Sequence, residues 1–128
     1  MNDTTNVTTE LRAMVRRELP EVSEIQDPDL REKVIEVWAL AIAESSFNAI
    51  SEIKASGNPD TPPLKQGTQA DHLRGVTRIA MRMADELSDL FDLLTVHRDH
   101  LIAGALCHDV GKPWEFDPEN QKRWKSSP

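Results

Sequence analysis

Residues 101–113 read LIAGALCHDVGKP, and the rest of the chain is organised around them. The run of apolar and small residues predicts a buried helix that begins near His97 and ends at Gly111, a residue suited to a left-handed C-cap. Its Ala-Gly-Ala centre lets other helices approach closely, which places this helix in the middle of the fold. The helix finishes on His108 and Asp109, two polar side chains that can both bind a metal ion.

Three further helices are predicted from apolar spacing and from start and stop signals. Asp27-Pro28 offers an N-cap followed by proline at the first helical position. The residues between 57 and 70 carry three prolines and two glycines and are expected to form a loop. The expected helices cover residues 8 or 9 to 19, residues 29 to 57 with a bend near Ser45-Ser46, and residues 70 to 90. With no strand-like alternation, and with no clear periodicity in residues 114–128, the fold class is all-α.

The third of these helices has a clear apolar stripe. Its members recur at intervals of three and four residues, as one face of a helix requires, and we expect this face to point inward. The opposite face is charged and is expected to be solvated. The expected inward residues are His72, Val76, Ile79, Met83, Leu87 and Leu90, and the expected outer residues are Arg74, Arg78, Arg82, Asp85 and Asp89.

Composition excludes several classes of function. The 128 residues carry 15 Lys and Arg against 22 Asp and Glu, a net charge of -7, so a general nucleic-acid binder is not expected. A single cysteine, Cys107, excludes an intrachain disulfide framework and fits a reducing compartment. The sequence shows neither a secretory signal nor an apolar run long enough to span a membrane. We therefore expect a cytoplasmic protein with no membrane partner, and composition leaves a homo-oligomer open.

Three side chains form the candidate site. His72 stands at the start of the third helix, and His108 and Asp109 stand at the end of the fourth. If these helices are antiparallel neighbours, two imidazoles and a carboxylate meet at one point. Such donors suit Mn, Fe, Co, Ni, Zn or Mg, and a bridging carboxylate can hold two ions. Lys112, three residues after Asp109, could neutralise an anionic substrate or a developing negative charge.

Each of these residues also has a simpler interpretation. His72 alone could be a packed or half-exposed histidine, and Lys112 could merely complement the helix dipole. His97 and His100 lie about 16 and 12 Å from His108 along one helix, too far to share an ion with it. They are expected to be surface or packing residues. Trp114 and Phe116 could wall a pocket or pack on the core, and Arg74 or Arg78 could reach a phosphate or remain solvated.

The sequence resembles the HD-domain superfamily of metal-dependent phosphohydrolases. The matching pieces are DHLRGVTRIA at residues 71–80 and HDVGKP at residues 108–113, so the resemblance covers about residues 70–113. It implies an all-helical bundle in which His72, His108 and Asp109 are metal ligands, Asp109 also positions the nucleophile, and Lys112 contacts phosphate. Residues 1–69 would then be N-terminal helices and a loop, and residues 70–128 the N-terminal part of an HD-type metal-binding core, either separate or continuous.

The resemblance implies hydrolysis of a small phosphate ester or nucleotide by a metal-activated water. Two alternatives are a non-catalytic helical regulatory or interaction module that retains the metal motif, and an HD-type iron oxygenase, which would need His97 or His100 as further ligands. The family has a last aspartate ligand on a later helix. The only aspartate after Asp109 here is Asp117, which stands too near in sequence. We therefore expect the chain to be a fragment of a longer protein that supplies this ligand, with a naturally short or degenerate family member as the alternative.

Overall fold

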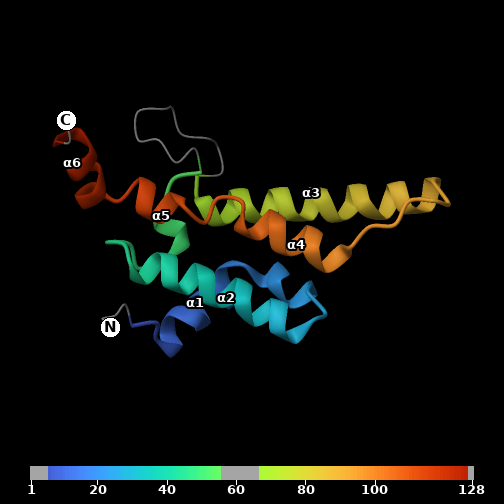
Figure 1. Ribbon diagram of the computed structural model, residues 1–128, viewed down its shortest axis with the longest axis horizontal. Coiled ribbons are helices and arrows are strands. Elements are labelled where there is room, and N and C mark those ends of the chain that lie inside the picture. The colour runs from blue at the N-terminus through green and yellow to red at the C-terminus, as the bar shows by residue number, and fades with distance from the viewer. Residues whose placement is uncertain (1–5, 56–66, 127–128) are drawn as a thin grey trace.

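The computed structural model describes residues 6–55 and 67–126, which form a bundle of helices (Figure 1). Within these ranges there is no strand, only one isolated bridge between Lys54 and Thr68. The predicted all-α class is therefore confirmed, whereas most of the predicted loop at 57–70 lies outside the described residues. The helices, two of them short 3-10 turns, are α1 (Thr9–Glu18), η1 (Pro20–Glu24), α2 (Pro28–Ala43), η2 (Ile50–Glu52), α3 (Gln69–Leu90), α4 (Arg98–Cys107), α5 (Lys112–Glu115) and α6 (Pro118–Ser126).

The starts of the N-terminal helices follow their capping residues. Thr8 is the N-cap of α1, and its hydroxyl accepts a hydrogen bond from the backbone N–H of Leu11. Asp27 caps α2 in the same way through the N–H of Asp29, with Pro28 at the first position. These side chains satisfy backbone donors that have no partner within the helix. Both predicted starts are confirmed.

The second helix ends at Ala43, next to the break predicted near Ser45-Ser46, and does not continue to Gly57. The hydroxyl of Ser45 donates to the carbonyl oxygen of Ile42, and Ser46 donates its N–H and hydroxyl to the carboxylate of Asp117. Side-chain bonds of this kind compete with the helical ladder. They turn the chain before the short helix η2, and Gly57 lies outside the described residues.

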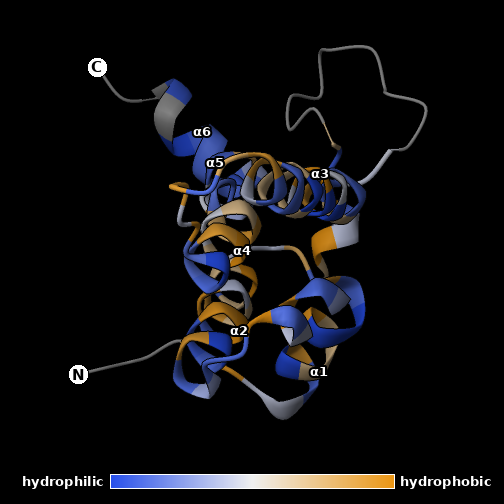
Figure 2. Ribbon diagram, turned by 90° about the vertical axis from the view of Figure 1, so that its right-hand side faces the viewer, coloured by the Kyte–Doolittle hydropathy of each residue, from blue (hydrophilic) through white to orange (hydrophobic). Residues whose placement is uncertain are grey.

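The core lies where α2 packs against α1 and α4. Figure 2 shows hydrophobic residues concentrated along α2 and α4, between α3 and α1. Trp38 of α2 is fully buried, and its indole N–H donates to the carbonyl oxygen of Leu106 on α4 at 2.7 Å. Leu106 is itself fully buried. This contact fixes the last turn of α4 against α2, two residues before His108.

Helix α3 runs antiparallel to α4 and packs along it (Figure 1). It does not bury the predicted apolar stripe. Leu73 and Thr77 are fully buried and Ala84 nearly so, whereas Ile79 and Met83 are exposed. The stripe has the predicted helical period. However, α3 turns a neighbouring strip, which includes Leu73, Thr77 and Ala84, toward the interior and leaves most of the stripe exposed.

The end of α4 also differs from the prediction. The helix ends at Cys107 with His108 as C-cap, and Gly111 has a φ of −79°, so it is not a left-handed cap. The chain continues in right-handed turns, in which Lys112 N–H donates to the carbonyl oxygen of Asp109 at 2.9 Å. The segment without clear periodicity then forms α5 and α6. In the part of the chain that the structure describes, no helix has the length and apolar character needed to cross a membrane.

Candidate metal centre

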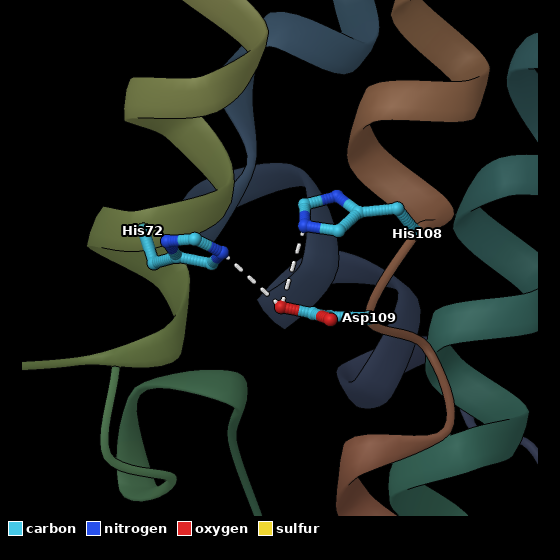
Figure 3. A group of neighbouring side chains, drawn as sticks. All are labelled: His72, His108 and Asp109. Carbon is cyan, nitrogen blue, oxygen red and sulfur yellow. Dashed lines mark ion pairs between the residues drawn. The ribbon is translucent and has the colours of Figure 1, made fainter. Parts of the chain in front are cut away.

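Three predicted side chains converge between the start of α3 and the end of α4 (Figure 3). The Nε2 of His72 lies 3.2 Å from Oδ2 of Asp109, and the Nε2 of His108 lies 3.4 Å from the same oxygen. One donor atom from each residue lies within 4.8 Å of the others. The two imidazole rings meet edge to face, with centroids 5.4 Å apart. A spacing of this size allows a single ion to contact all three donors.

Local structure fixes both ends that carry these side chains. Thr68 caps α3 by accepting a hydrogen bond from the N–H of Asp71, and the N–H of Gln69 donates to the carbonyl oxygen of Ile53 at 2.7 Å. His72 therefore stands on the anchored first turn of α3. On the other side, the Trp38 contact holds the last turn of α4, from which His108 and Asp109 project.

The hydrogen bond of His108 determines which of its ring nitrogens can bind a metal. Its Nδ1 lies 2.6 Å from the carbonyl oxygen of Ala105, which can only accept, so this nitrogen carries the proton. In a neutral ring, Nε2 then presents a lone pair toward Asp109. A lone pair and a carboxylate oxygen 3.4 Å apart repel each other unless a cation or a proton lies between them. The geometry therefore fits a divalent metal ion, and a carbonyl partner is the usual support of a metal-binding histidine.

Gln69 is a site residue that the sequence interpretation missed. Its side chain is fully buried, and its Nε2 donates to Oδ2 of Asp109 at 2.7 Å. Its Oε1 is buried without a hydrogen-bond partner among the described residues. A buried amide with one unpaired atom costs stability, so its retention here fits a role in orienting the carboxylate. The available signal was its position three residues before His72, which places both side chains on one side of α3.

Lys112 lies near the centre but does not point at the three donors. Its ammonium lies 3.6 Å from Oε2 of Glu115 and 5.0 Å from the ring centroid of Phe116. It begins α5, one turn beyond Asp109. The ammonium therefore lies over the Phe116 ring, and the predicted phosphate contact of Lys112 would require its side chain to leave Glu115.

The other candidates have different partners. His97 and His100 stack on each other at the start of α4, with centroids 4.0 Å apart. Asp117 is buried, binds Ser46 and accepts from the N–H of Glu119 at the start of α6, so it is not part of the metal cluster. Burial raises the pKa of the Cys107 thiol, which disfavours the thiolate that a metal would bind.

The predicted solvated position of Arg74 is wrong. Its guanidinium donates to the carboxylate of Glu21, a mostly buried residue of η1, at 2.9 Å. This hydrogen bond raises the pKa of Arg74 above its ordinary value, so the side chain stays charged. The pair ties the first half of α3 to the N-terminal helices, and it leaves Arg74 with a structural partner in place of a phosphate.

Comparison with known proteins agrees with this geometry. Residues 70–127 match the HD domain family model. These residues belong to the HD-domain superfamily. A curated relative, the dihydroneopterin 2',3'-cyclic phosphate phosphodiesterase of Methanocaldococcus jannaschii, is 35% identical over 96 residues, which cover 73% of this chain and 38% of that protein. The chain thus spans well under half of this relative's length. No solved structure is similar enough to count as a match.

The relative is named as a phosphodiesterase. HD domains bind divalent metals, and the convergence of His72, His108 and Asp109 could hold one. Among the residues that the structure describes, this cluster includes no fourth histidine, cysteine or carboxylate. Three protein ligands and open coordination positions are typical of catalytic metal sites, whereas structural zinc sites are usually closed by four.

Proposed function

We propose that this chain carries the metal centre of an HD-type phosphodiesterase that hydrolyses a small phosphate ester. One observation carries the proposal: one ligand atom from each of His72, His108 and Asp109 lies within 4.8 Å of the other two. Two supports hold this arrangement, the Ala105 carbonyl behind His108 and the Gln69 amide on Asp109. Preorganised donors of this kind are what metal-assisted hydrolysis requires.

In this reaction, four residues would have defined roles. His72, His108 and Asp109 would hold one or two divalent ions, of the group Mn, Fe, Co, Ni, Zn or Mg. A divalent ion at this position supplies Lewis acidity toward a phosphoryl oxygen and makes water acidic enough to serve as a nucleophile near neutral pH. Asp109 would also orient the attacking water. Lys112 would offset the phosphate charge. For this contact, its side chain would move away from Glu115 and toward the substrate.

The substrate class follows from chemistry and from the relative. The relative is named for a 2',3'-cyclic phosphate, a diester whose two ester oxygens, at positions 2' and 3', close a ring through the phosphorus. We propose a small cyclic phosphodiester as the substrate class here. Water would attack phosphorus, one ester bond would break, and the leaving oxygen would take a proton, giving a phosphomonoester. A cytoplasmic location is part of this proposal.

A non-catalytic module that retains the metal is the second candidate. It is favoured by one observation: the ammonium of Lys112 is 3.6 Å from Oε2 of Glu115, so the predicted substrate contact is engaged with another partner. The iron oxygenase alternative has less support, because His97 and His100 pair with each other and not with His108. Metal binding is therefore common to both surviving candidates, and turnover separates them.

The decisive experiment measures metal content and then turnover. Protein purified without chelator is analysed for bound transition metals and titrated with Mn²⁺ by calorimetry, as wild type and as His108→Ala and Asp109→Ala. We expect metal in the wild type and its loss in both variants. His100→Ala is the matched control, an exposed histidine on the same helix, and it should bind metal normally.

Hydrolysis is measured with Mn²⁺ on bis(4-nitrophenyl) phosphate and on a 2',3'-cyclic nucleotide. Turnover that disappears in His108→Ala and persists in His100→Ala supports the phosphodiesterase. Metal binding without hydrolysis of either compound favours the non-catalytic module. A wild-type protein that binds no divalent ion contradicts both.

A further inference from the structure

The exposed apolar face of α3 is a surface feature that the metal centre does not explain. Ile79, Met83, Leu87 and Leu90 recur at helical spacing and are 61%, 58%, 40% and 69% exposed. In Figure 1 the C-terminal part of α3 and the loop after it extend past the ends of α2 and α4. Scattered apolar side chains are ordinary on a surface, but a continuous stripe on one helix face marks an interaction site.

Charges beside this stripe have a definite order. Arg78 and Arg82 lie in the first half of one flank, and Glu86 and Asp89 lie in the second half of the same flank. The opposite flank carries Thr77 and Ala84, which are buried. Because the opposite flank is buried, a partner helix would contact the charged flank, which carries both positive and negative side chains.

We propose that α3 pairs with α3 of a second copy of this chain, antiparallel and about a two-fold axis near Met83. This register sets Ile79 level with Leu87 of the second copy and Val76 level with its Leu90. A helix pair related in this way brings like flanks together, so Arg82 meets Glu86 of the second copy. A parallel two-fold pair would instead turn this charged flank toward the opposite flank of the second copy, where Thr77 and Ala84 are buried. The charge order therefore specifies a self-complementary, antiparallel contact.

The charged groups required for this contact have no competing ion pairs. Among the described residues, the ion pair on this part of α3 joins Asp85 to Arg98, on the side toward α4. Neither Arg82 nor Glu86 takes part in an ion pair within the described chain. The two side chains and Met83 and Leu87 together line a shallow surface pocket, which the mirrored side chains of the second copy could fill.

The expected strength is modest. Stable interfaces bury roughly 800 Å² per partner, and one helix face lies at the low end of that range. We therefore expect a dissociation constant on the order of 10 μM, with most of the energy from the apolar stripe and a smaller share from the ion pairs. The contact involves none of the three metal ligands, so metal titration separates a failure of this proposal from a failure of the proposed function.

Sedimentation velocity between about 5 and 500 μM tests the contact by charge reversal. Wild type should change from monomer to dimer across this range. Arg82→Glu and Glu86→Arg should each remain monomeric, because each sets like charges against each other. An equimolar mixture of the two variants should dimerise, since the variant charges are then complementary, and the double variant should dimerise alone. Arg17→Glu, an exposed reversal on α1, is the control and should dimerise like wild type.

The measurement has clear contrary outcomes. Wild type that stays monomeric throughout would overturn the proposal and would leave the α3 face for a different polypeptide. Single variants that still dimerise would place the contact elsewhere. A mixture that stays monomeric, while circular dichroism shows both variants helical, would exclude the antiparallel register.

Discussion

Replacing Gln69 by methionine tests whether this buried amide prepares Asp109 for metal binding. Methionine has a similar length and no hydrogen-bond donor, so the change removes the 2.7 Å bond to Oδ2 of Asp109 and keeps the side-chain volume. The wild-type amide is fully buried, and its Oε1 has no partner in the described chain. The substitution therefore removes one strong bond and one unpaired polar atom at the same time.

Two energies of opposite sign follow from that geometry. A hydrogen bond to a charged group contributes about 1.5–3 kcal/mol, which corresponds to about a 10- to 150-fold change in an equilibrium constant. Loss of support for a metal ligand typically weakens metal binding about 10- to 100-fold. The free energy of unfolding without metal should change by less than about 1 kcal/mol, because removal of the unpaired Oε1 offsets the lost bond. Metal affinity should fall while stability is nearly kept.

Calorimetric titration with Mn²⁺ and urea unfolding of the metal-free protein measure these two quantities. Gln26→Met, at an exposed position before α2, is the control and should change neither. Equal Mn²⁺ affinity in folded Gln69→Met and wild type would refute the positioning role. A large loss of stability with unchanged affinity would show that Gln69 serves the start of α3 alone.

Two further changes probe the supports around the site. Trp38→Phe removes the 2.7 Å bond to the Leu106 carbonyl and leaves a small void in the core, so the free energy of unfolding should fall by about 2–4 kcal/mol in urea titration; a change below about 0.5 kcal/mol would contradict this anchor. Burial tends to raise the pKa of Asp117, but hydrogen bonds from Glu119 and Ser46 outweigh it, so the pKa lies below its usual value. This carboxylate stabilises the fold above its unfolded pKa of about 3.9 and loses that effect as pH falls through the lower folded pKa. Asp117→Asn should therefore cost about 1.5–3 kcal/mol at pH 7, with the difference shrinking below about pH 4; a difference independent of pH would contradict the assignment.

Local signals predicted the parts of the fold that depend on neighbouring residues. The side chains of Thr8 and Asp27 cap helices where their types and positions indicated. The convergence of His72 with His108 and Asp109 was predictable because helix polarity alone brings the start of one antiparallel helix to the end of the next. Nothing more than the order of the helices and their apolar spacing was needed for that step.

Distant partners decided the features that the sequence interpretation missed. The end of α2 depends on Asp117, which lies 71 residues from Ser46 in sequence and bonds to it in space. Arg74 looked like a solvated cation because its partner Glu21 belongs to a 3-10 turn with no periodic signal. Gln69 resembles any polar residue at a helix start, and only the position of Asp109 gives it a role.

The face of α3 shows why periodicity alone cannot assign burial. The stripe of Ile79, Met83 and Leu87 indicates a face suited to contact with other apolar residues. The pattern does not indicate whether those residues belong to the described chain. His72 precedes Met83 by eleven residues, close to three helical turns, so it lies on the same side of α3 as the stripe. In the proposed register, α3 of the second copy ends at Leu90, level with Val76 and about one turn from His72. Whatever covers the apolar face therefore also borders the metal centre, and the covering of α3 and the access of substrate to the ion are parts of one structural problem.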